Sequence, residues 1–174
     1  GAQGIGRGIV LCMAKAGADI AIADLKIEDA KKVAGEVAAL GRKAIAVKTD
    51  VTKQADFETC FDRVKKELGQ INSNTPVQPG DRLSDVWTSQ KHTVIDLGDD
   101  LFTRGRPHPM IDHRLRNERL IKEASDPEVA VILLDVVLGY GSHPDPAAEM
   151  VPVIQKARDL ASKAGRHLAI MGFV

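Results

Sequence analysis

Apolar residues recur alternately at helical spacing and in short β-branched runs up to about residue 72. Ile5, Ile9 and Met13 share one face of a helix, and the run DIAIADL that follows Gly17 has the composition of a buried strand. The same alternation continues with Lys and Glu on the outer face of each helical stretch. It predicts helix, strand, helix, strand and helix over residues 4–17, 19–25, 27–41, 43–51 and 53–69.

The alternation stops over residues 70–92, where Asn, Pro, Gly, Ser and Thr gather without a sustained period. An irregular stretch of more than about a dozen residues is uncommon inside a compact domain. Residues 73–91 are therefore predicted to be a linker between two domains, 1–72 and 92–174.

After the linker the alternation resumes, and the run VAVILLDVVLG is typical of a central parallel strand. Pro152 favours a kink or a late start in the next helix. The pattern predicts strand, helix, strand, helix and strand over residues 92–98, 112–126, 129–139, 146–165 and 167–174. Because the chain starts without Met and on a helix that lacks its strand, we expect a piece of a longer protein.

Strands that alternate with helices in both halves predict an α/β fold. The expected architecture is a three-layer α/β/α arrangement around a mainly parallel sheet of about five strands. We expect the strand 167–174 to lie beside the strand 19–25, in the place of a missing first strand. Unpaired edges of such a sheet would allow a homo-oligomer to form.

Composition narrows the class of partner. Lys plus Arg and Asp plus Glu both total 24, so no net charge attracts nucleic acid, and 3% aromatic residues are too few for base stacking. Cys12 and Cys60 lack disulfide or metal spacing, and no apolar run approaches the roughly eighteen residues of a membrane span. We expect a cytoplasmic protein that binds neither nucleic acid nor membrane, with at most a small-molecule nucleotide as partner.

The opening stretch GAQGIGRG and two strand-end acids carry a family resemblance. Residues 1–72 resemble the front of the short-chain dehydrogenase/reductase family, especially acetoin and diacetyl reductases. Gly4 and Gly6 match the second and third glycines of the family's T-G-x-x-x-G-x-G loop. Asp24 matches the acid that binds the adenosine ribose, and Asp50 resembles the acid of a D-V pair beside the adenine.

This resemblance implies a Rossmann-like half that binds NAD, since a carboxylate at Asp24 would repel the 2′-phosphate of NADP. The family's catalytic Ser and Tyr-x-x-x-Lys have no counterpart, because the only tyrosine, Tyr140, has no lysine four residues on. No catalytic residue is assigned, reductase activity from this chain alone is not expected, and a ligand-free α/β scaffold is an alternative. The implied cofactor-binding residues are Gly4, Ile5, Gly6, Asp24, Leu25, Asp50 and Val51.

The segments VIDLGDDLFTRGRPHPMID and VAVILLDVVLGYGSHPDP carry a second resemblance. Residues 92–174 resemble the FdrA family of acyl-CoA synthetase-like proteins, related to the C-terminal part of the succinyl-CoA ligase β subunit. This implies a flavodoxin-like half and acyl or carbamoyl transfer as its chemistry, with CoA or phosphate ranking below NAD as ligands. The chain is then a chimera of two βα families.

Two loops of the second half are candidate anion sites. One, FTRGRPHPMID, follows the predicted strand 92–98, where open α/β sheets place ligands; alternatively its arginines pair with Asp99 and Asp100. The other offers backbone N–H groups between the strand 129–139 and the next helix. The candidate anion-binding residues are Arg104, Arg106, His108, Gly139, Gly141 and Ser142.

The histidines form no zinc pattern along the sequence. His108, His113, His143 and His167 belong to separate loops, so no metal site is predicted. His143 close to Asp145 is a candidate proton-transfer pair, with an exposed loop histidine as the alternative.

Overall fold

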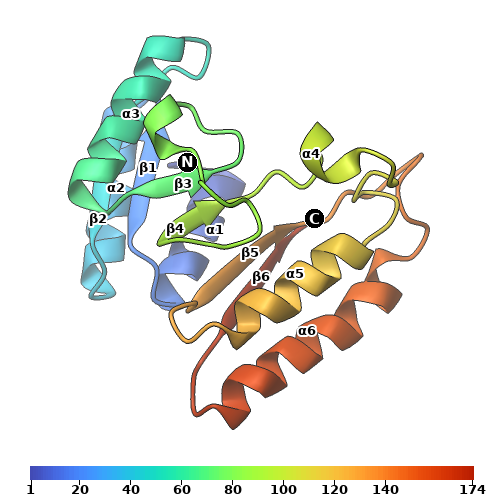
Figure 1. Ribbon diagram of the computed structural model, residues 1–174. Coiled ribbons are helices and arrows are strands. Elements are labelled where there is room, and N and C mark those ends of the chain that lie inside the picture. The colour runs from blue at the N-terminus through green and yellow to red at the C-terminus, as the bar shows by residue number, and fades with distance from the viewer. The chain divides into compact units, whose positions relative to one another are not determined.

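The computed structural model describes all residues 1–174, and the chain divides into two compact units, Gly1–Ile95 and Asp96–Val174. Six strands form three separate two-stranded sheets, and every pair is parallel (Figure 1). The predicted α/β class with parallel strands is therefore confirmed. The prediction of one sheet of about five strands is wrong.

Unit 1, Gly1–Ile95, is built on two parallel strands with helices on both faces. Ile20 and Ile22 face a core shared with the first two helices, whereas Ile45 and Val47 face the third helix, because successive side chains of a strand point to opposite faces. Its elements are α1 (Gly4–Lys15), β1 (Ile20–Asp24), α2 (Ile27–Ala39), β2 (Ala44–Lys48), α3 (Gln54–Glu67), β3 (Ile71–Ser73), η1 (Pro79–Asp81) and β4 (His92–Val94).

The stretch after α3 contains a short sheet, of which β4 lies within the predicted strand 92–98 and β3 was not predicted. β3 pairs in parallel with β4, with Ile71 opposite His92 and Ser73 opposite Val94. The 3₁₀ turn η1 is tied to α3, since Lys65 Nζ lies 2.9 Å from a carboxylate oxygen of Asp81. Residues 73–91 thus lie within unit 1.

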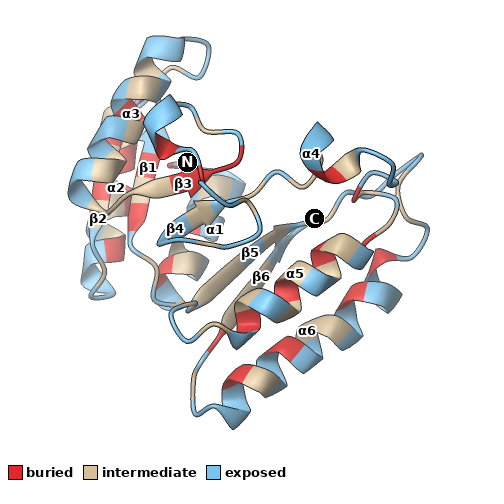
Figure 2. Ribbon diagram, in the orientation of Figure 1, coloured by how far each residue is buried: buried red, intermediate tan, exposed pale blue.

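Unit 2, Asp96–Val174, packs two helices against two strands. Leu120 of the first long helix is 2% exposed in the core, and burying it contributes about 1.5–3 kcal/mol. Figure 2 shows buried residues recurring along both long helices. Ile132 and Leu134 pack against this core, whereas Leu133 is 57% exposed. The elements are α4 (Asp100–Thr103), α5 (Arg114–Ser125), β5 (Val131–Asp135), α6 (Pro146–Lys163) and β6 (Ala169–Phe173).

The last strand pairs within its own unit. β6 lies beside β5, with Ala169 opposite Val131, and not beside β1 as expected. β5, α6 and β6 form a local βαβ unit, which closes a shorter loop than pairing with a distant strand and so loses less chain entropy. With one neighbour, β5 is also not the central strand that its apolar run predicted.

α6 begins at Pro146 and continues through Pro152, so the late start is wrong. A proline at the first helical position has no hydrogen bond to lose, which explains why the helix begins there. None of the helices combines the length and the apolar character that a membrane span requires.

Candidate functional site

The glycine-rich loop of unit 1 lies against the carboxyl end of β1. The Gly1 amino group is 3.2 Å from the Ala23 carbonyl oxygen, and the Ala2 N–H donates to Asp24 Oδ2 at 2.9 Å. A Cβ at Gly6 would meet Gly1 Cα at 3.1 Å, so a side chain there would crowd the loop. Gly4 has a φ of 53°, in the left-handed region that favours glycine.

The Asp24 carboxylate is the charged centre of this edge. Its Oδ1 accepts the Lys26 N–H at 2.9 Å, and its Oδ2 lies 2.9 Å from the Gly1 amino group as well as the Ala2 N–H. Hydrogen bonds from Lys26, Ala2 and Gly1 hold the pKa of Asp24 well below its usual range. Three of about four lone-pair positions are used, so the carboxylate can accept one more donor.

The turn after β2 lies next to the end of β1, because the Thr49 N–H donates to the Asp24 carbonyl oxygen at 3.0 Å. Within this turn, Asp50 Oδ1 accepts the Thr52 hydroxyl at 2.7 Å and the Thr52 N–H at 3.1 Å. These bonds lower the pKa of Asp50. The Asp50 side chain therefore shapes its own turn.

Open polar and apolar groups surround the same edge. Gln3, the residue before α1, makes no side-chain capping bond, so the first N–H groups of the helix are open to an anion. Ile5, Leu25 and Val51 are 80%, 59% and 72% exposed. The structure thus brings all seven residues of the predicted cofactor site to the carboxyl edge of β1 and β2, and their binding role stays a prediction.

In unit 2, a pocket of about 300 Å³ lies beside the arginine-containing loop. Arg106 lines it together with Phe102, Leu115 and Glu118. Arg104 and His108 are outside this lining, and the His108 Nδ1 accepts the Met110 N–H at 3.2 Å.

His108 also lies close to Gly98, because a Cβ at Gly98 would lie 2.6 Å from His108 Nε2 and the ring would have to shift. Asp99, offered as a partner for the arginines, accepts the Leu101 N–H at 2.9 Å as the N-cap of α4. Arg114 and Asp112 also line the pocket, and the Arg114 Nε–H donates to Asp112 Oδ1 at 3.0 Å and to Oδ2 at 2.9 Å. These bonds lower the pKa of Asp112 to about 2.

The second predicted anion loop is held by its own hydrogen bonds. The Ser142 hydroxyl donates to the Gly139 carbonyl oxygen at 2.7 Å, and Gly139 and Gly141 both have positive φ. Asp145 caps α6 by accepting the Ala148 N–H at 2.9 Å. Anion binding by this loop stays a prediction. The Asp145 carboxylate already accepts one of the free N–H groups at the start of α6.

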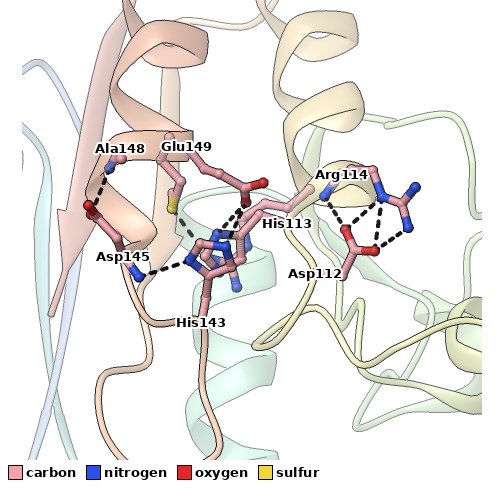
Figure 3. Close-up of polar contacts among 9 residues, drawn as sticks. Asp112, His113, Arg114, His143, Asp145, Ala148 and Glu149 are labelled. Carbon is pink, nitrogen blue, oxygen red and sulfur yellow. Dashed lines mark hydrogen bonds and ion pairs between the residues drawn. The ribbon is translucent and has the colours of Figure 1, made fainter.

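The structure also joins three side chains that the sequence did not connect: His113, His143 and Glu149 (Figure 3). His113 is the N-cap of α5, and the other two lie just before and within the first turn of α6. Each helix leads into one strand of the parallel pair β5 and β6, so both helices begin at the carboxyl edge of that sheet. The signal in the sequence that could have indicated this cluster is that His113 and His143 each come just before a helix that begins at this edge.

The fold and these sites define a parallel α/β protein assembled from two kinds of segment. Residues 1–74 match the short chain dehydrogenase family, and residues 48–174 match the CoA-ligase family, so the two matches overlap over residues 48–74. The chain belongs to the CoA-ligase family, with a short-chain dehydrogenase segment at its start. Both predicted resemblances are thereby confirmed.

Several proteins are similar to parts of this chain. Uncharacterized protein YahF of Escherichia coli K12 is 50% identical over 117 residues, covering 67% of this chain and 22% of YahF. The L-2,3-butanediol dehydrogenase of Corynebacterium glutamicum is 44% identical over 71 residues, covering 40% of this chain and 28% of the dehydrogenase. The chain thus spans less than a third of either relative.

Solved structures with some likeness are short-chain dehydrogenases. A hydroxysteroid dehydrogenase from Escherichia coli aligns over 98% of this chain and 69% of its own, at 19% identity. A short-chain dehydrogenase/reductase from Mycobacterium marinum aligns over 97% of this chain and 66% of its own, at 18% identity. Their TM-scores of 0.41 and 0.39 are too low to assign the fold of the whole chain.

Proposed function

We propose that the carboxyl edge of β1 and β2 binds the ADP-ribose part of NAD and does not transfer hydride. The Asp24 carboxylate is the observation that supports this most. It is ionised, fixed by three hydrogen-bonding groups, and left with one acceptor position at the end of a parallel strand. A ribose hydroxyl is a donor suited to that position.

The neighbouring groups suit the rest of ADP-ribose. The uncapped start of α1 offers backbone N–H groups and the positive end of the helix dipole to a pyrophosphate. Gly6 allows the backbone of Gly1 to lie close against the start of α1. The exposed side chains of Ile5, Leu25 and Val51 offer apolar surface for an adenine.

If the site recognises only the ADP-ribose part of NAD, the relative affinities of related nucleotides can be predicted. No catalytic Ser or Tyr-x-x-x-Lys is present to act on a nicotinamide or its substrate. NAD and ADP-ribose should therefore bind with similar affinity. NADP should bind more weakly, because its 2′-phosphate would lie against the ionised Asp24 carboxylate.

Isothermal titration calorimetry of the full chain with NAD, ADP-ribose and NADP tests the proposal. Asp24→Asn should weaken NAD binding about 10- to 100-fold, the effect of losing a hydrogen bond to a charged acceptor. Glu28→Gln is the matched control, since Glu28 is an exposed carboxylate of the first turn of α2. An absence of NAD binding, or equal loss in both variants, would contradict the proposal.

A further inference from the structure

Two imidazoles and one carboxylate converge at the carboxyl edge of β5 and β6. His113 Nδ1 lies 3.2 Å from Glu149 Oε2, and His143 Nε2 lies 3.6 Å from the same oxygen. The two rings have their centroids 4.9 Å apart. Figure 3 shows the three side chains pointing toward one another.

The His113 side chain is only 1% exposed, and its buried Nδ1 atom has no hydrogen-bond partner. A buried nitrogen without a partner is unfavourable, and nitrogen and carboxylate lone pairs at 3.2 Å repel unless a proton or a metal ion lies between them. The contact with Glu149 does not have hydrogen-bond geometry. A metal ion shared by the two atoms would satisfy both.

We propose that His113, His143 and Glu149 bind a divalent first-row transition-metal ion, with Zn²⁺ as the representative. Ligand atoms of a tetrahedral zinc site are about 3.4 Å apart, given metal–ligand distances of roughly 2.0–2.1 Å. Two of the three separations already match this value. All three ligand atoms lie within 4.8 Å, so a small approach of the two imidazoles completes the set.

The chemistry of the three donors selects the kind of ion. Imidazole nitrogens favour zinc and its neighbours, whereas Mg²⁺ and Ca²⁺ favour sets made of oxygen alone. Three protein ligands also leave the fourth position open to water or to a ligand atom, as in catalytic zinc sites. The site is therefore expected to exchange its fourth ligand.

Some of the charged groups around His113 favour binding of a cation, and others oppose it. Burial lowers the pKa of His113, and the neighbouring Arg116 lowers it further, so the imidazole stays in the neutral form that binds metal. Arg116 also repels a cation, while Glu149 and Asp112 attract one. These opposing charges favour moderate rather than extreme affinity.

His143 supplies a second, local readout. Its Nδ1 accepts the Asp145 N–H at 3.1 Å, which leaves the proton of the neutral ring on Nε2. Coordination through Nε2 requires that proton to move to Nδ1. The Asp145 N–H then loses its acceptor on the ring and forms a hydrogen bond with water. Zinc binding should therefore shift the amide resonance of Asp145 and the ring resonances of His143.

The test is a titration of the full chain, without a histidine tag, with Zn²⁺ against a chromophoric chelator. One equivalent should bind, Mg²⁺ should not compete, and Co²⁺ should give tetrahedral d–d absorption. Glu149→Gln and His143→Gln should each weaken binding at least about 100-fold, because even second-shell partners of a metal contribute 10- to 100-fold. Both positions are partly exposed, so these variants should fold.

His167→Gln is the matched control, because this histidine precedes β6 outside the cluster. It should bind zinc as the parent chain does. Loss of binding in His167→Gln equal to that in the two ligand variants would overturn the proposal. So would an absence of stoichiometric zinc in the folded parent chain.

Discussion

Asp24 links stability to pH at the scale of a single residue. Its folded-state pKa lies well below the unfolded value near 3.9, so it stabilises the fold above about pH 4. That contribution falls as the pH drops below the unfolded pKa, because the unfolded chain then gains a proton that the folded chain does not. The ionised side chain thereby holds the glycine-rich loop on β1.

Asp24→Asn should lower the free energy of unfolding of unit 1 by about 1–3 kcal/mol near pH 7, since the hydrogen bonds to a charged acceptor are lost. The difference from the parent chain should shrink as the pH falls toward about 3.5. Urea unfolding followed by circular dichroism at several pH values measures both effects. A difference that stays constant with pH would mean that packing, not charge, holds the loop.

Sequence reasoning placed Asp24 beside the glycine-rich loop but did not bring His113 together with His143 and Glu149, and one physical reason explains both outcomes. Gly4, Gly6 and Asp24 belong to a local strand, loop and helix motif whose spacing is fixed along the chain. The contact of His113 with His143 and Glu149 depends on how α5 and α6 align over β5 and β6. No local spacing encodes that alignment.

At the scale of elements, α6 carries a proline within its interior. Pro152 lies six residues after the first residue of the helix, where it lacks the N–H that would bond to the carbonyl four residues earlier. Its side chain is exposed, so little packing depends on it. The helix forms because its other face is buried against α5 and the strands.

Pro152→Ala should therefore stabilise unit 2, by about 1–3 kcal/mol, because it restores a helical hydrogen bond and removes a steric clash. Thermal unfolding followed at 222 nm measures the change. Pro146→Ala should give no such gain, because a proline at the first helical position loses no hydrogen bond and the buried Pro146 ring loses its packing when it is removed. A gain in Pro146→Ala equal to that of Pro152→Ala would contradict this explanation.

Long elements can be predicted from apolar periodicity, whereas a short strand depends on its pairing with another strand. The long helices and strands were found because each has several apolar residues at a regular spacing. β3 was missed because Ile71, Asn72 and Ser73 form a three-residue strand with one apolar side chain. Its identity as a strand comes from the partner β4 and not from its own composition.

At the scale of the whole molecule, the family segments and the compact units divide the chain differently. The CoA-ligase match begins at residue 48, inside unit 1, whereas the units divide between Ile95 and Asp96. Sheets β1–β2 and β3–β4 belong to the first unit, and β5–β6 belongs to the second. No strand pairing joins the two units, so no sheet is shared between them.

Residues 1–95 and 96–174 should therefore fold when produced separately. Each separate unit should give dispersed amide resonances that overlay those of the full chain, except near the cut. A ligand stabilises only the unit that binds it, by about 2.7 kcal/mol at a concentration a hundred times its Kd. In the full chain, NAD should therefore raise one unfolding transition and Zn²⁺ the other.

Calorimetry of the full chain with each ligand distinguishes independent from coupled units. If the units are independent, a ligand that raises one transition leaves the other at its original temperature. A single transition that both ligands raise together would show that the units unfold as one cooperative body. Separate units that are unfolded by circular dichroism would also show coupling, because each would then depend on the other for its stability.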